Sequence, residues 1–396
     1  MCAAAGTSRV RADIALLAEL VRFASVSREP SRPIADFASA RLESAGCHVW
    51  RQEYDGGRKV NLLARKGPDG PDGLLLSAHL DVVPADEPGW RSEPFRLVER
   101  EGRLYGRGAA DMKGFLALAL NRLAAARENE LRAPLALLLT SDEELGSLGA
   151  QAFVREWRHE FPLPRNVLVG EPTGLRVVRM HKGHLRVCVR VAGKPAHSGF
   201  PHLGENAIER AGPVVVALAR LAEIMRRERT ETSECFPECP YPVLNVGVIR
   251  GGEAVNVVPA ACDLTLGIRL LPGQRSEAAV QRVRDALAEL PAAVRSAVSL
   301  EVLNDSPPML CAAGAPLNEQ LAELVGQRES FGSLYASDAG TLSRLGLDCV
   351  LCGPGDMTDA HRPDESIAID QLAAGGELLD RIIRRFCVED GVAGGR

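Results

Sequence analysis

The chain is organised around the segment Leu74-Leu75-Leu76-Ser77-Ala78-His79-Leu80-Asp81-Val82-Val83-Pro84, an apolar run that delivers a histidine and an aspartate at its end. The apolar run predicts a buried β-strand. Side chains alternate along a strand, so His79 and Asp81 lie on the same side of it. A carboxylate can hold one ring nitrogen of a histidine while the other nitrogen binds a metal ion. Taken alone, such a segment is more often a polar strand end than a metal site.

Length and composition describe a chain that can form two domains. Its 396 residues are long for one domain, and 46% of them are hydrophobic, which is enough to bury a large core. The formal net charge is −5 without a long block of one sign, which argues against nucleic acid or an anionic membrane surface as a partner. A small-molecule partner is therefore expected.

The sequence also predicts a cytoplasmic location. No apolar run approaches the roughly 20 residues of a membrane span. Arg9, Arg11 and Asp13 precede the first apolar cluster, where a signal peptide would have its apolar core. The ten cysteines are scattered, so reduced thiols are expected. A zinc site at Cys349-x-x-Cys352 or Cys235-x-x-x-Cys239 is a less favoured alternative, because no second pair lies near the first.

The first part of the chain alternates strands with helices, which predicts an α/β fold with a largely parallel sheet and helices on both faces. Hydrophobic periodicity and turn signals define the individual elements. Helices are predicted at residues 13–23, 34–42, 112–127 and 148–157, and strands at residues 47–52, 60–64, 74–84, 135–140 and 167–169.

The pattern changes near His181. Strands are predicted at residues 185–191, 243–250, 261–271 and 298–302, and helices at residues 205–229 and 276–290. The order βαββαβ is typical of a small sandwich with helices on one face of an antiparallel sheet. We therefore predict an inserted domain at residues 180–305. Residues 1–179 and 306–396 form the other domain, because helices at 317–325 and 369–386 bracket a further apolar strand at 349–351.

Acidic residues follow several of the predicted strands. Glu143 and Glu144 come directly after the strand at 135–140, and Glu171 follows the strand at 167–169. Adjacent carboxylates repel one another unless a positive charge lies between them. The carboxyl ends of strands are also where sites form in open α/β sheets.

Two further residues complete a possible metal site. Asp111 lies between a glycine-rich loop and a helix, where an isolated aspartate would usually be a helix N-cap. His361 lies in a loop after the strand at 349–351. Two histidines and three carboxylates at the ends of separate buried segments are the ligand set of a two-metal hydrolytic site. Asp111 is our choice for the carboxylate that bridges the two ions.

Five motifs resemble the M20 family of metallopeptidases and deacylases, in the family's order and over nearly the whole chain. They are His79-x-Asp81-Val82-Val83-Pro84, Gly106-Arg107-Gly108 with Asp111-Met112-Lys113-Gly114, Glu143-Glu144-x-Gly146, Gly170-Glu171-Pro172-Thr173 and His361-x-Pro363-x-Glu365. The resemblance implies a catalytic domain at residues 1–179 and 306–396, and an amidohydrolase with two divalent ions, Zn²⁺ or Co²⁺. It makes the ligands of one ion His79, Asp111 and Glu171, and those of the other Asp111, Glu144 and His361.

The resemblance also assigns roles outside the ligand set. It makes Glu143 the general base, which takes a proton from water and delivers it to the leaving amine. Asp81 stays beside the ligand His79. It further implies that residues 180–305 mediate a homodimer, in which His197 reaches the partner's active site as an oxyanion donor. By itself, His197 is an ordinary loop histidine.

Four residues bear on the substrate, which we expect to be an N-acyl amino acid. Asn256 and Arg269 match family positions that bind the substrate carboxylate; the alternatives are a turn amide and a surface arginine. Gly340 stands where desuccinylases and carboxypeptidases have arginine, while Asp338 leaves an acid that favours a cationic side chain. A turn cap is the alternative role for Asp338. We therefore predict a deacetylase acting on a cationic acetyl amino acid.

Two kinds of alternative remain. One is another enzyme of the same family: a desuccinylase, an aminoacylase or a dipeptidase. The other is a binding protein on the same fold that has lost the chemistry, which the presence of all five ligands and the base disfavours.

Overall fold

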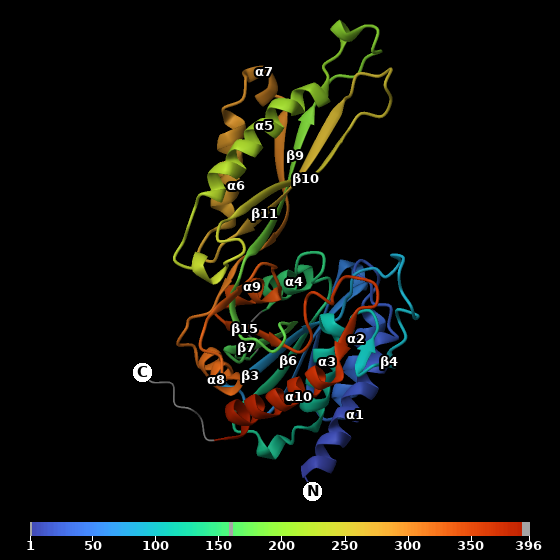
Figure 1. Cartoon of the computed structure of the whole chain (residues 1–396), viewed down its shortest axis with the longest axis vertical. Coiled ribbons are helices and arrows are strands. Elements are labelled where there is room, and N and C mark those ends of the chain that lie inside the picture. The colour runs from blue at the N-terminus through green and yellow to red at the C-terminus, as the bar shows by residue number, and fades with distance from the viewer. Residues whose placement is uncertain (1, 158–160, 390–396) are drawn as a thin grey trace. The chain divides into compact units, whose positions relative to one another are not determined.

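The computed structural model describes residues 2–157 and 161–389, which form two compact units (Figure 1). The first, called here the sheet unit, comprises Met1–Arg179, Cys311–Phe331 and Ser337–Arg396. The second, called the inserted unit, comprises Met180–Leu310 and Gly332–Ala336. Among the helices described, none has the length and apolar character needed to cross a membrane.

The sheet unit is built on a mixed sheet with the strand order β1-β2-β6-β3-β7-β15-β8. The strand bounds are β1 His48–Tyr54, β2 Lys59–Lys66, β3 Leu74–His79, β6 Leu135–Thr140, β7 Asn166–Pro172, β8 Val178–His181 and β15 Asp348–Gly353. Strand β3 pairs in parallel with β6 and β7, and β15 pairs in parallel with β7. Strands β1, β2 and β8 run antiparallel to their neighbours. The predicted α/β fold with a largely parallel sheet is confirmed.

Helices cover both faces of this sheet (Figure 1). Helices α2 and α3 pack on one face, α1 and α10 pack against α3, and α4 and α9 lie on the other face. The bounds are α1 Cys2–Val21, α2 Arg32–Ser44, α3 Gly114–Ala125, α4 Leu148–Glu156, α8 Pro316–Val325, α9 Asp338–Leu342 and α10 Ile369–Ile383. Every residue of β3, β6 and β7 is buried as a result. This explains why their sequences are continuous apolar runs.

Leu104-Tyr105 is strand-like in sequence and belongs to β5 (Arg103–Tyr105), but the other strands of three residues were not predicted because they carry too little periodicity. Strands β4 (Val98–Arg100), β5 and β16 (Ser366–Ala368) form a small antiparallel sheet. Strand β14 (Phe331–Ser333) pairs with β8. Helix α3 begins at Gly114 with Lys113 at its N-cap position, so Asp111 is not the cap of this helix.

The inserted unit has an antiparallel sheet with the strand order β10-β11-β9-β12. In chain order its elements are β9 Gly183–Ala192, α5 Ala207–Arg226, β10 Val243–Gly251, β11 Ala261–Leu270, α6 Ser276–Ala288, α7 Ala292–Arg295 and β12 Val298–Ser306. A short strand, β13 (Met309–Leu310), pairs with Met180 and His181 of β8.

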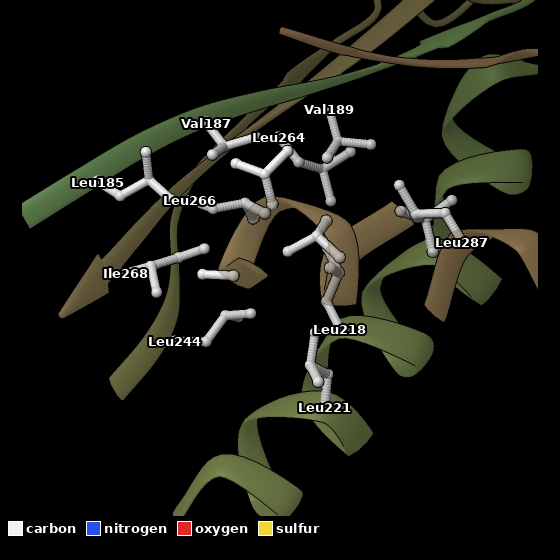
Figure 2. Packing of buried hydrophobic residues seen from close by; sticks show 14 of the residues in the cluster. Leu185, Val187, Val189, Leu218, Leu221, Leu244, Leu264, Leu266, Ile268 and Leu287 are labelled. Atoms are coloured by element: carbon white, nitrogen blue, oxygen red, sulfur yellow. The ribbon is translucent and has the colours of Figure 1, made fainter. Parts of the chain in front are cut away.

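An aliphatic core joins this sheet to its helices. Figure 2 shows Leu185 and Val187 of β9 and Leu264 of β11 lying opposite Leu218 of α5. Buried and partly exposed residues alternate along β11, so one face of the sheet meets the helices. Each buried leucine stabilises the unit by about 1.5–3 kcal/mol. The inserted unit therefore has a core of its own.

Candidate metal centre

Adjacent parallel strands bring the predicted ligands to one edge of the sheet unit. His79 ends β3, Glu144 follows β6, and Glu171 lies near the end of β7. Strands β6 and β7 flank β3 in parallel, so their carboxyl ends meet at the same edge. Asp111 precedes α3, and His361 follows β15.

The two oxygens of Asp111 face two different imidazoles. His79 Nε2 lies 3.0 Å from Asp111 Oδ1, and His361 Nε2 lies 3.2 Å from Asp111 Oδ2. His361 Nε2 also lies 2.8 Å from Glu144 Oε1. Ligand atoms lie within 4.8 Å of one another in two groups, His79-Asp111-Glu171 and Asp111-Glu144-His361. Asp111 is the member common to both groups.

The second nitrogen of His79 is held by backbone instead of by the neighbouring carboxylate. Its Nδ1 lies 2.9 Å from the backbone oxygen of Asp81 and 3.7 Å from Oδ1 of that residue. The Asp81 carboxylate instead accepts hydrogen bonds from Ser27 Oγ at 2.8 Å and from the backbone N–H groups of Glu143 and Glu144 at 3.1 and 3.3 Å. Asp81 therefore fixes the segment that carries both glutamates.

The acids of the site are crowded enough to resist ionisation. Burial raises the pKa of Glu171 well above its usual value, and the Asp111 carboxylate adds to the effect. Burial also raises the pKa of Glu143, to which the neighbouring Glu171 contributes. Burial and Asp111 raise the pKa of Glu144. A cation among these carboxylates would relieve the repulsion.

The neighbouring carboxylates raise the pKa values of both imidazoles, which favours their charged form. Hydrogen bonds to Asp111 and Glu144 raise the pKa of His361 to about 10. Burial alone would lower the pKa of His79, but Asp111 and Asp81 raise it well above its usual value. The site thus favours positive charge among its carboxylates. A set of imidazole nitrogens and carboxylate oxygens suits zinc and similar divalent ions, so the donor set fits two such ions.

Glu143 lies beside the ligands with its side chain free. Its backbone N–H is bound by Asp81, and within residues 2–157 and 161–389 its carboxylate makes no hydrogen bond. The residue is partly exposed. A carboxylate of this kind is available to a water molecule.

Asp338 lies at the start of α9 and is 2% exposed. Its Oδ2 accepts a hydrogen bond from Thr140 Oγ1 at 2.5 Å, and burial raises its pKa to about 6. The N-cap hydrogen bond of α9 is made by Ser337, whose Oγ accepts from the N–H of Ala339. Asp338 is therefore not the cap. Thr140 lies opposite His79 in the sheet register, so its hydrogen bond places Asp338 near that ligand.

The inserted unit brings His197 and Asn256 together. Ser198 donates its N–H to the Asn256 carbonyl at 3.0 Å, and His197 forms an isolated β-bridge with Val257. His197 is exposed, and its Nδ1 accepts from the N–H of Gly199 at 3.0 Å.

Arg269 lies elsewhere in this unit, on β11 opposite His184 of β9. It is partly buried, and burial lowers its pKa. Across the part of the chain that the structure describes, it forms no ion pair. An anionic ligand would supply that partner.

Sequence reasoning missed the buried charges that support the site. Lys59 Nζ lies 2.6 Å from Asp142 Oδ1, and both side chains are almost fully buried. The only signal for Asp142 was the run of three acids that ends in Glu144. The cysteine alternative gains no support, because neither candidate ligand group among the described residues contains a cysteine.

Comparison with known proteins defines the class. The model of the family described as "Peptidase family M20/M25/M40" matches residues 75–385, and the chain belongs to this family. It is similar to the acetylornithine deacetylase of Myxococcus xanthus, with 39% identity over 382 residues that cover 94% of this chain and 97% of the relative. It is also similar to the acetylornithine deacetylase of Pasteurella multocida, with 35% identity over 361 residues that cover 91% and 92% of the two chains.

Solved structures share the fold. An M20 family metallo-carboxypeptidase from Sulfolobus solfataricus matches with a TM-score of 0.76 and 20% identity, covering 94% of this chain and 98% of that one. A dinuclear metal-binding M20 peptidase from Bacillus subtilis matches with a TM-score of 0.66 and 15% identity, covering 96% and 98%.

Proposed function

We propose that this protein is a deacetylase that converts N2-acetyl-L-ornithine into L-ornithine and acetate, a step of arginine biosynthesis. The observation that carries the proposal is the pair of ligand groups that share Asp111, with the free carboxylate of Glu143 beside them. The similarity to acetylornithine deacetylases over 94% and 91% of the chain supports the choice of substrate.

Two divalent ions, Zn²⁺ or Co²⁺, complete the proposed site. His79, Asp111 and Glu171 would hold one ion, and Asp111, Glu144 and His361 the other. When bound, such ions polarise the acyl carbonyl and lower the pKa of water to about 7.

The chain's own residues then move the proton. Glu143 accepts a proton from the attacking water as the new C–O bond forms on the acetyl carbonyl. It delivers that proton to the amide nitrogen as the C–N bond breaks, which releases acetate and a free amine. A carboxylate with a raised pKa suits both halves of this transfer. Asp81 keeps Glu143 in place through its backbone N–H.

We also propose that the protein acts as a homodimer through the inserted unit. Strand β10 is an edge of its sheet and exposes apolar side chains, among them Ile249 with 54% of its surface accessible. An unpaired apolar edge favours association. In the dimer, His197 of the partner subunit would donate to the developing oxyanion, and Arg269 and Asn256 would bind the substrate carboxylate.

Subunit mixing tests the dimer. Glu143→Gln and His197→Ala chains, each inactive alone, should regain activity when mixed, because a heterodimer contains one intact composite site. Absence of recovery after proven subunit exchange would mean that His197 does not act in trans.

A substrate panel tests the specificity. We expect kcat/KM to be higher for acetyl-ornithine than for acetyl-citrulline, acetyl-methionine or succinyl-diaminopimelate. Asp338→Asn should reduce the preference for the cationic substrate if this acid senses the ammonium group. A lead of more than about tenfold for a neutral or succinyl substrate, or roughly 1.4 kcal/mol in transition-state binding, would contradict the assignment.

A further inference from the structure

The guanidinium of Arg107 joins three separate segments of the sheet unit. Arg107 is 1% exposed. Its Nε donates to the Pro84 carbonyl at 3.1 Å, and its Nη1 donates to the Arg362 carbonyl at 3.3 Å and to Glu365 Oε2 at 2.9 Å. Its Nη2 pairs with the carboxylate of Glu87. All of its nitrogen atoms are therefore engaged.

Glu365 continues the network towards the metal centre. It is 1% exposed, and its Oε1 accepts the backbone N–H groups of Ala110 at 3.0 Å and of Asp111 at 3.1 Å. Its own carbonyl accepts the N–H of Gly106 at 3.0 Å. One carboxylate thus binds Arg107 with one oxygen and the backbone of Asp111 with the other.

The segments joined in this way carry three of the five proposed metal ligands, His79, Asp111 and His361. Pro84 lies five residues after His79, and Arg362 directly follows His361. Asp111, the ligand common to both groups, has its backbone N–H on Glu365. Neither Arg107 nor Glu365 belongs to either candidate ligand group.

We propose that Arg107 and Glu365 are a positioning pair, which sets the separation of His79, Asp111 and His361 without touching the metal ions. This inference rests on the proposed function, since it concerns the same dinuclear centre. The planar guanidinium can bind several acceptors in fixed directions, which a lysine ammonium does not reproduce. Hydrogen-bond partners that orient metal ligands typically contribute 10–100-fold to metal affinity.

If Arg107 and Glu365 only stabilised the fold, their substitution would give different results. A buried ion pair that only stabilises the fold would change stability and leave metal affinity unaltered. Asp13 and Arg122 provide a matched control, with 3% and 9% of their side chains exposed. Arg122 lies in the last turn of α3, whereas Asp111 precedes the first turn of that helix. Asp13→Asn therefore disturbs a buried pair at the far end of the same helix.

The experiment compares the full-length, metal-free wild-type chain with Glu365→Gln, Glu365→Ala, Arg107→Lys and Asp13→Asn. Each is titrated with Zn²⁺ by calorimetry, and the visible spectrum is recorded with Co²⁺. We expect Glu365→Ala and Arg107→Lys to bind at least one ion about 10–100-fold more weakly and to change the Co²⁺ spectrum. Glu365→Gln keeps the acceptor for Asp111 and should lose less. Asp13→Asn should bind both ions as the wild type does.

The outcomes separate the two proposals. If the wild type binds no Zn²⁺, the proposed function fails. If the wild type binds two ions and Arg107→Lys and both Glu365 variants match its affinities and Co²⁺ spectrum, the positioning pair is refuted. If Glu365→Ala does not fold, Arg107→Lys and Glu365→Gln decide by the same two readouts. An equal loss of metal affinity in Asp13→Asn would also refute the pair, because the effect would then be general.

Discussion

The residues that the sheet unit buries differ in kind from those in the core of the inserted unit. The sheet unit buries Lys59, Arg107, Asp111, Lys113 and Glu171, all at most 5% exposed. The core cluster of the inserted unit consists of aliphatic side chains with one cysteine and one methionine (Figure 2). Buried charges cost stability unless they are paired, so a fold that keeps many of them does so for another purpose. The contrast separates the buried charges of the sheet unit from the aliphatic core of the inserted unit.

The strands reflect the same contrast. Strands β3, β6 and β7 are buried on both faces and carry polar residues, His79, Thr140 and Glu171, at or next to their carboxyl ends. Strand β11 alternates buried and partly exposed residues along its whole length. Only the first arrangement brings several strand ends together at one edge of a sheet.

Metal removal should have the largest effect and should act on the sheet unit alone. Exhaustive chelation is expected to abolish hydrolysis, and Zn²⁺ or Co²⁺ to restore it. Calorimetry should show a lower melting temperature for the sheet unit, because Asp111, Glu144 and Glu171 then face one another without a cation. The transition of the inserted unit should not move. Full activity in metal-free protein would contradict the metal centre.

Glu143→Gln should have the second-largest effect, a loss of about 10²–10⁴-fold in kcat. The amide cannot accept the proton, while the ligands remain in place. Metal analysis should still find two ions per chain. A parallel loss of metal would instead make Glu143 a ligand.

Leu264→Ala should affect the inserted unit by packing alone. Leu264 is fully buried at the centre of the aliphatic core (Figure 2), so its truncation should lower the free energy of unfolding by about 2–5 kcal/mol. Urea unfolding measures the change, and Zn²⁺ affinity should stay at the wild-type value. Val216→Ala, at an exposed site on α5 away from the β10 edge, is the control and should lower stability by less than about 0.5 kcal/mol. A fall in metal affinity in Leu264→Ala would contradict this, because it would show that packing in the inserted unit affects the metal centre.

Acidification should lower the stability of the inserted unit through His181, a buried histidine with only one ring nitrogen hydrogen-bonded among the described residues. His181 Nδ1 lies 2.9 Å from the Lys182 carbonyl, its Nε2 is unpartnered within the described chain, and burial lowers its pKa to about 4. The pKa of the folded state lies below the unfolded value near 6.5, so stability is complete above that value and declines as pH falls towards 4. At pH 5 the loss is about 2 kcal/mol.

The test is urea unfolding at pH 7 and pH 5 for the wild type and His181→Asn, whose amide can replace the Nδ1–H donor. The variant should lose less stability between the two pH values. His184, whose pKa burial and Arg269 lower to about 4, remains as a common background. An unchanged pH dependence would show that His181 does not titrate in this range.

The sequence by itself determined the fold class and the elements with strong periodicity. The predicted strand at 135–140 and the observed strand β6 have the same bounds, because a short apolar run lies between Pro134 and the polar residues Ser141 and Asp142. The motifs also nominated all five proposed ligands. Residue type and spacing carry that information locally, and parallel strands bring their ends together whatever the loops between them do.

Only the tertiary structure decided which partners each polar group takes. The pattern His79-x-Asp81 suggested that the carboxylate holds the imidazole, yet the carboxylate binds Ser27 and the backbone of Glu143. The pairing of Arg107 with Glu365 joins residues 258 positions apart. Periodicity records which face of an element is buried, but a hydrogen bond between distant segments depends on how the loops close over the sheet. That closure is a property of the whole fold.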